Sequence, residues 1–208
     1  MKVSLLLTLS FFLPLAFSDD VEQVKDINGK PIFPGGTYYI MPAIMGPPGG
    51  GVRLGQTGNS ECPLTVLQNY AEVDFGLQVK FKIPGISPGI IFTGTQLEIE
   101  FAEKPRCAES SKWSVFVDNE IQKACVGIGG PEGHPGQQTF SGTFHIEKHR
   151  LGYKLVFCMT GSPTCLDIGR FDANKGEGGR RLNLTEHEPF EVVFVDASNF
   201  DGIIKSVV

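Results

Sequence analysis

Glycine and proline recur every few positions along this chain, and their spacing is the strongest constraint on its fold. The sequence holds 26 glycines and 14 prolines among 208 residues. Proline cannot continue a helix interior and glycine weakens one, so a long amphipathic helix has little room between them. The chain is therefore expected to be all-β, with many short strands joined by tight turns.

Several segments between these turn formers have the pattern of half-buried strands. Residues 77–83 and 97–101 alternate apolar and polar side chains with a period of two. Residues 140–146, 153–158 and 190–195 are rich in aromatic and β-branched side chains. Such strands predict a barrel or a sandwich, and the local pattern leaves both open because no three-fold internal repeat is found.

The N-terminus predicts a secretory signal peptide at residues 1–18. Lys2 precedes an apolar run over residues 5–17, which is shorter than the roughly 20 residues needed to span a bilayer. The small residues Ala16 and Ser18 favour cleavage after Ser18. A membrane anchor is the alternative interpretation.

The expected mature chain, residues 19–208, has the size of one all-β domain. Loss of Lys2 changes the formal charge from −5 to −6, and no cluster of like charge remains. We therefore expect no nucleic-acid partner and no membrane association of the mature form. Secretion to the extracellular space (the apoplast) is the default expectation, with a vacuole as the alternative.

Five cysteines would enter an oxidising compartment, where pairing is expected. Two disulfides and one free thiol follow, and the residues alone allow fifteen choices of two bridges. The cysteines are Cys62, Cys107, Cys125, Cys158 and Cys165. Asn183 begins the sequon Asn-Leu-Thr, so it is a candidate for N-glycosylation, although short sequons also arise by chance.

Patterns that resemble catalytic or metal sites lack the context that their chemistry needs. Ser87 lies in a G-x-S-x-G pattern, but Pro88 prevents the helix that must follow a nucleophilic serine. His145 and His149 lack the H-E-x-x-H order of a zinc protease. We expect no enzyme activity, no metal and no cofactor, and we expect Trp113 to be a core residue.

Motifs spread over the mature chain resemble the soybean Kunitz family of protease inhibitors. Val24-x-Asp26-x-x-Gly29-x-x-Ile32-x5-Tyr38-x-Ile40 matches the family's N-terminal signature at every specified position. Further similar segments are residues 35–40, 62–66, 113–115, 153–158, 167–169 and 180–182. The resemblance implies a β-trefoil, which is a six-stranded barrel capped by three hairpins.

The resemblance also implies a disulfide pattern. It pairs Cys62 with Cys107 and Cys158 with Cys165, which leaves Cys125 free. Because Cys125 lies in an apolar stretch, a buried and inert thiol is expected there rather than a redox or intermolecular role.

Members of this family inhibit proteases by presenting an exposed loop as a rigid substrate mimic, and docking such a loop costs little entropy. Here the resemblance places the protease-binding loop at Ile83, Pro84, Gly85, Ile86, Ser87, Pro88, Gly89 and Ile90. Ile86–Ser87 is the candidate reactive bond, and Lys82–Ile83 is a weaker alternative. The two prolines restrict the backbone on either side of Ile86–Ser87.

Two residues of this chain depart from the family pattern. Trypsin's specificity pocket requires Arg or Lys, whereas Ile86 occupies the pocket-filling position, so an elastase-like or subtilisin-like target is expected. Pro34 replaces an asparagine that braces the loop in family inhibitors, and proline has no side-chain hydrogen-bond donor.

Two alternatives therefore stay open: inhibition of cysteine proteases through another loop, and a non-inhibitory storage, defence or signalling role. In each inhibitory case the partner is a protease, and the inhibitor is expected to be a monomer.

Overall fold

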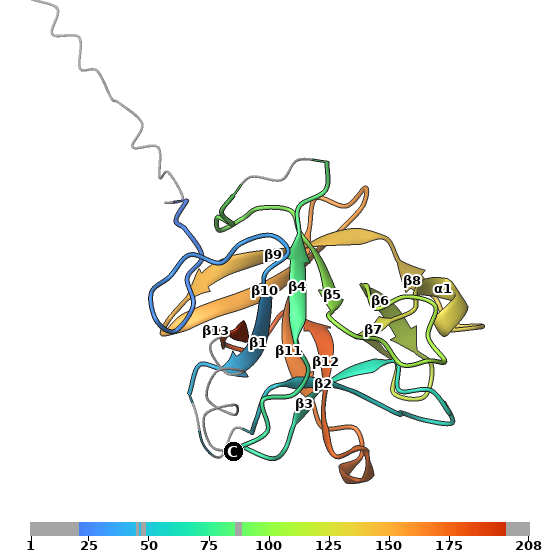
Figure 1. Cartoon of the computed structure of the whole chain (residues 1–208). Coiled ribbons are helices and arrows are strands. Elements are labelled where there is room, and N and C mark those ends of the chain that lie inside the picture. The colour runs from blue at the N-terminus through green and yellow to red at the C-terminus, as the bar shows by residue number, and fades with distance from the viewer. Residues whose placement is uncertain (1–20, 45, 47–48, 86–88, 199–208) are drawn as a thin grey trace, which may run out of the picture.

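The structure is a computed structural model that describes residues 21–44, 46, 49–85 and 89–198 (Figure 1). Its strands are β1 (Thr37–Pro42), β2 (Val52–Gly55), β3 (Thr65–Asn69), β4 (Val79–Lys82), β5 (Glu98–Phe101), β6 (Trp113–Asp118), β7 (Lys123–Ile128), β8 (Thr139–Phe140), β9 (Gly142–His149), β10 (Gly152–Met159), β11 (Cys165–Phe171), β12 (Gly179–Thr185) and β13 (Val192–Asp196). The two named helical elements are the short turns α1 (Gly130–Gly133) and η1 (Lys175–Glu177), and the last described residue, Ser198, is also helical. None of the described helices is long and apolar enough to cross a membrane.

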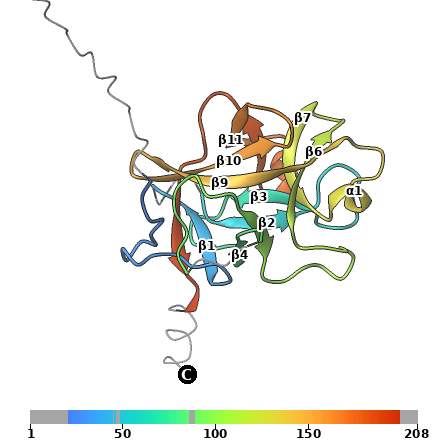
Figure 2. The ribbon, with the colours of Figure 1, turned by 90° about the horizontal axis from the view of Figure 1, so that it is seen from above.

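The strands expected from the sequence are present, with shifted ends. β4 and β5 lie within the two alternating segments, and β10 and β13 cover most of the aromatic and β-branched ones. The segment at residues 140–146 is divided between β8 and the much longer β9, which pairs with β10 along its whole length. Figure 2 shows this β9–β10 hairpin running across the molecule. The all-β prediction is confirmed.

All thirteen described strands belong to one curled sheet, in the order β5-β4-β1-β13-β10-β11-β12-β3-β7-β6-β8, with β2 on β3 and β9 on β10. The first strand of this path is also connected to later parts of it. Leu97, just before β5, forms a bridge with Phe144 of β9, and Glu100 forms one with Lys112 beside β6. When the first strand of a sheet also bonds to strands near the other end of the same sheet, the sheet closes into a barrel and is not a sandwich.

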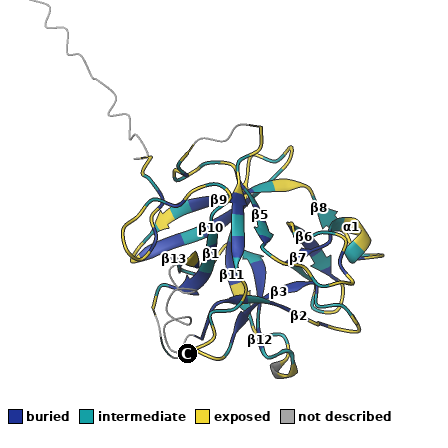
Figure 3. Ribbon diagram, viewed as in Figure 1, coloured by how far each residue is buried: buried dark blue, intermediate teal, exposed yellow. Residues whose placement is uncertain are grey.

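One apolar cluster fills the inside of the curled sheet (Figure 3). Phe81 of β4 meets Phe194 of β13 edge to face, with ring centroids 5.4 Å apart. Trp113 is 2% exposed and packs between Phe101 and Phe144, which confirms its expected place in the core. Aromatic contacts of this geometry add stability beyond the area that they bury.

A buried ion cluster stands beside this apolar core. The Arg181 side chain of β12 is 2% exposed, and its guanidinium lies 2.6 Å from Asp118 and 2.5 Å from Glu177. Burial opposes its charge, but the hydrogen bonds and charge of Glu177, together with Asp118, raise the pKa of Arg181 above its ordinary value. The cluster joins β12, the end of β6 and η1, which are distant in sequence.

Two disulfides join Cys62 to Cys107 and Cys158 to Cys165, the pairing that the resemblance implies. The first closes a sequence separation of 45 residues, which on the chain-entropy model stabilises the fold by about 4 kcal/mol. The second links β10 to β11 across their hairpin.

Cys125 is the free cysteine and is fully buried, and burial raises the pKa of its thiol to about 12. At neutral pH this thiol is protonated and therefore a poor nucleophile.

Candidate functional site

The N-terminal limb of the expected protease-binding loop continues directly from β4. β4 pairs with β5 from Val79↔Phe101 to Lys82↔Glu98. On its other side, Thr37 and Tyr38 of β1 pair with β4. Ile83 is half-buried and packs against the core cluster. Strand pairing and core contacts therefore fix the chain as far as Ile83, where the loop begins.

The C-terminal limb is held by the N-terminal segment at residues 22–36, which we call the strap. Ile91 is fully buried, and its backbone N–H donates to the Ile32 carbonyl at 3.1 Å. The Val24 N–H donates to the Ile91 carbonyl at 2.9 Å. Gln23 forms a bridge with Phe92. Both limbs of the loop are thus fixed to the body of the molecule by backbone hydrogen bonds.

Between these limbs the described loop residues face solvent. Pro84, Gly85 and Gly89 are exposed, and Ile90 is half-buried. Gly85 has φ 84°, a conformation that strains any residue with a Cβ, so glycine is required at this turn. Ile86, Ser87 and Pro88 lie outside the described residues, and with them the candidate bond Ile86–Ser87 and the G-x-S-x-G serine.

The alternative bond, Lys82–Ile83, is poorly placed for a protease. Lys82 belongs to the β4 ladder, and its ammonium lies 2.8 Å from Glu100. Ile83 packs on the core. A protease must bind the residues around a scissile bond in its own cleft, and here they are already paired within the inhibitor's sheet. The geometry therefore favours the exposed part of the loop over Lys82–Ile83.

Pro34 lies in the strap, where family inhibitors have an asparagine. The strap reaches the loop limbs through its backbone on both sides of this residue: the Gly35 N–H donates to the Phe81 carbonyl, and the Ile32 carbonyl accepts from Ile91. The Phe33 N–H donates to the Tyr38 hydroxyl at 2.9 Å. The limbs of the loop are thus braced without a side-chain donor at position 34.

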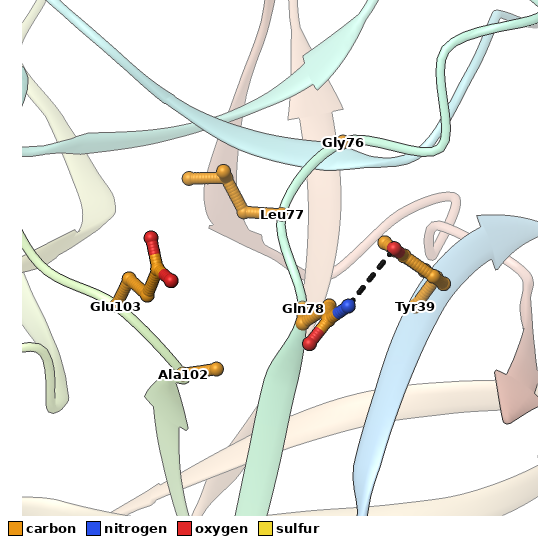
Figure 4. Close-up of a pocket in the computed structure, with 6 residues that line it drawn as sticks. All are labelled: Tyr39, Gly76, Leu77, Gln78, Ala102 and Glu103. Atoms are coloured by element: carbon orange, nitrogen blue, oxygen red, sulfur yellow. Dashed lines mark hydrogen bonds between the residues drawn. The ribbon is translucent and has the colours of Figure 1, made fainter. Parts of the chain in front are cut away.

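A shallow pocket of about 220 Å³ lies at the end of β4 opposite the loop (Figure 4). Gly76, Leu77 and Gln78 line it just before β4, and Ala102 and Glu103 line it just after β5. The Gln78 amide donates to the Tyr39 hydroxyl at 3.0 Å. This pocket is therefore separated from the loop by the full length of the β4–β5 hairpin.

Comparison with known proteins agrees with this arrangement. A family model described as trypsin and protease inhibitor, of the legume Kunitz type, matches residues 24–196. The chain belongs to this legume Kunitz family. A relative from Canavalia lineata, the subtilisin inhibitor CLSI-II, is 66% identical over 191 residues, which cover 90% of this chain and 99% of the relative.

Solved structures of Kunitz inhibitors share the fold of this chain. A Kunitz type trypsin inhibitor from Cicer arietinum is 72% identical and superposes with a TM-score of 0.82, over 85% of this chain and 99% of that one. Soybean trypsin inhibitor in complex with porcine pancreatic trypsin is 32% identical, with a TM-score of 0.72 over 84% and 99% of the two chains. The curled sheet is therefore a Kunitz-type β-trefoil, as the resemblance implies.

The hydrogen bonds between residues 22–24 and residues 91–93 could not be expected from the sequence. Residues 22–24 have no strand pattern, and these bonds are made by the backbone, which any residue except proline can donate, apart from the one that the Thr93 hydroxyl accepts from the Glu22 N–H at 3.0 Å. The sequence signals for the strap were the family signature, which begins at Val24, and the bracing position occupied by Pro34. Among the described residues, no group of three His, Cys, Asp or Glu side chains could hold a metal ion. His145 instead bonds through Nδ1 to the Gly94 carbonyl, at 3.0 Å.

The proposed glycosylation of Asn183 conflicts with its place in the fold. Asn183 lies within β12, between Gly169 of β11 and Cys125 of β7, and is 7% exposed. Its Nδ2 atom, to which a glycan would be attached, donates to the Leu184 carbonyl at 2.8 Å. A glycan there would have to displace the strands on either side of β12, because the Asn183 side chain is almost fully buried between them.

We therefore expect the folded protein to be unmodified at Asn183. Because sequons are modified before folding is complete, a chain with a glycan at this position should fail to reach the native state. Intact-mass analysis of secreted protein, before and after enzymatic removal of N-glycans, should give the same polypeptide mass. A loss of mass on that treatment, from a protein that unfolds cooperatively, would contradict the placement of Asn183.

Proposed function

We propose that this protein is a serine protease inhibitor that offers residues 83–90 as a substrate-like loop, with Ile86 in the specificity pocket and Ile86–Ser87 as the reactive bond. We further propose that its targets have apolar pockets, as subtilisin-like and elastase-like enzymes do, and that the chain is secreted after removal of residues 1–18. The observation that carries the proposal is the fixation of both loop limbs, by β5 and β1 on one side and by the strap on the other.

Preorganisation is the physical reason why such limbs favour inhibition. Anchoring at Ile83 and Ile91 reduces the backbone freedom that the ends of the loop lose on docking, so more of the contact energy appears as affinity. Exposed Pro84 and Gly85 leave the loop accessible. Two relatives are named for proteases with apolar pockets: CLSI-II is a subtilisin inhibitor, and a Bauhinia rufa relative with 43% identity over 60% of this chain is an elastase inhibitor. Other relatives, such as the Cicer arietinum protein, are named for trypsin, so the apolar target is proposed from Ile86 and not from the names.

The disulfide between Cys62 and Cys107 supports reversible inhibition. Ile86–Ser87 lies inside the segment that this disulfide closes. If a protease cuts the bond, the two pieces remain joined, and the paired limbs keep the new ends close together. The cut can then be resealed, because the reverse reaction is intramolecular and has a high effective concentration.

A panel of inhibition assays tests the proposed function. The mature protein should inhibit subtilisin and elastase with inhibition constants at least about 100-fold lower than that for trypsin, because Ile86 cannot pair with trypsin's pocket aspartate. Papain should keep its activity. Inhibition of papain alone would instead favour the cysteine-protease alternative, and four active proteases would favour a non-inhibitory role.

A further inference from the structure

Two exposed aromatic side chains lie beside the protease-binding loop. In the described part of the chain, Phe33 (46% exposed) and Phe92 (37% exposed) are the only phenylalanines among the exposed large apolar residues. The core contains most of the other aromatic rings, including Phe81, Phe101 and Phe194. Exposed phenylalanine is unfavourable in water, so two of them beside a proposed binding loop are informative.

A backbone hydrogen bond joins the residues that directly precede Phe33 and Phe92. The Ile91 N–H donates to the Ile32 carbonyl, and each of these two residues is followed directly by one of the phenylalanines. Phe92 also forms a bridge with Gln23 of the strap. Val21, which is 69% exposed, precedes Glu22, whose carbonyl accepts from the Thr93 N–H. Val21, Phe33 and Phe92 therefore lie where the strap meets the C-terminal limb of the loop, and we call them the apolar shoulder.

The size of a protease–inhibitor interface explains why a surface beside the loop is needed. Such interfaces bury about 800 Å² on each partner and use roughly 20–30 residues a side. The loop at residues 83–90 is too short to supply this area by itself. Phe92 follows Ile90 and Ile91 of the C-terminal limb directly in sequence, so a protease that binds the loop would approach the apolar shoulder.

We propose that Phe33 and Phe92 form a second contact surface that packs against an apolar patch of the same target protease, outside its active-site cleft. This inference depends on the proposed function of the loop. Aromatic side chains are enriched among the interface residues that carry most of the binding energy. The apolar shoulder therefore helps to set which protease is bound tightly, because a target with a charged rim at this position would have to desolvate it.

Alanine substitutions test this inference with subtilisin as the probe. Phe33→Ala and Phe92→Ala should each raise the inhibition constant about tenfold, and the double variant should raise it roughly 100-fold, mainly through faster dissociation. Phe33 bonds to Tyr38 through its backbone, so Phe33→Ala keeps that hydrogen bond. Val73→Ala is the matched control: Val73 is 89% exposed and precedes β4, at the end away from the loop.

The outcomes separate this inference from the proposed function. If wild-type protein inhibits subtilisin and the double variant inhibits it equally well, the apolar shoulder is not a contact surface, although the loop still acts. If wild-type protein inhibits none of subtilisin, elastase and trypsin, both proposals are wrong. Thermal unfolding of each variant should match wild type within a few degrees, and a weakened inhibitor that has also lost its folded state would overturn the assignment to binding.

Discussion

Replacing Ile86 with arginine is expected to turn this protein into a tight trypsin inhibitor. The Ile86→Arg side chain would reach the aspartate in trypsin's specificity pocket. A buried, hydrogen-bonded charge pair contributes roughly 2–5 kcal/mol when its loss leaves the partner unpaired. The inhibition constant for trypsin should therefore fall by at least about 30-fold relative to wild type. The inhibition constants for trypsin and for subtilisin should be measured on the same preparations of wild type and variant. They show how the substitution changes the inhibition of each protease.

A second arginine variant controls for the added positive charge. Ile44 is 57% exposed and lies just after β1, outside the loop and the strap. Ile44→Arg should leave the inhibition of both proteases within about twofold of wild type, since a surface charge mainly affects association rates. If Ile86→Arg and Ile44→Arg behave alike toward trypsin, Ile86 is not the pocket-filling residue.

Removing the buried arginine is expected to destabilise the fold more than any surface change. Arg181→Met would leave Asp118 and Glu177, both within the buried cluster, without their cation. Breaking a buried ion pair from one side costs about 3–5 kcal/mol, because the remaining charge is uncompensated. The guanidinium chloride midpoint of unfolding should fall accordingly.

An exposed ion pair of equal length gives the comparison. Lys112 and Glu98 also approach to 2.6 Å, but their side chains are 51% and 35% exposed. Exposed pairs contribute roughly 0–1 kcal/mol because water screens them. Lys112→Ala should therefore change the unfolding midpoint only slightly. Equal losses for Arg181→Met and Lys112→Ala would contradict the view that burial, rather than distance, decides the contribution of the Arg181 cluster.

The strands could be predicted from the sequence because their signal is local. Alternation around Phe81 and Ile99 has the period of a strand with one buried face, and β4 and β5 form there. Closure of the sheet could not be predicted in this way. It depends on bridges such as Leu97↔Phe144, between residues far apart in sequence, and no local pattern encodes them. The choice of barrel over sandwich came from family resemblance.

The site shows the same division between local and tertiary information. The position of the loop and the pairing of the cysteines both came from the family resemblance. The structure confirms the pairing, whereas the candidate bond Ile86–Ser87 stays a prediction. The burial of Asn183 could not be predicted, because its sequon is identical whether the residue lies on a surface or between β11 and β7. An arginine such as Arg181 would likewise be expected at the surface. It is buried because β12 places it beside Glu177 and beside Asp118, which is distant in sequence.

The most direct test of the central claim is to identify the bond that a target protease cuts. The protein would be incubated with a catalytic amount of subtilisin, and its mass would be measured before and after reduction. We expect one cut, at Ile86–Ser87, whose two fragments separate only when Cys62–Cys107 is reduced, since the cut lies inside that disulfide-closed segment. A single cut at Lys82–Ile83 or elsewhere, or progressive digestion with subtilisin fully active, would contradict it.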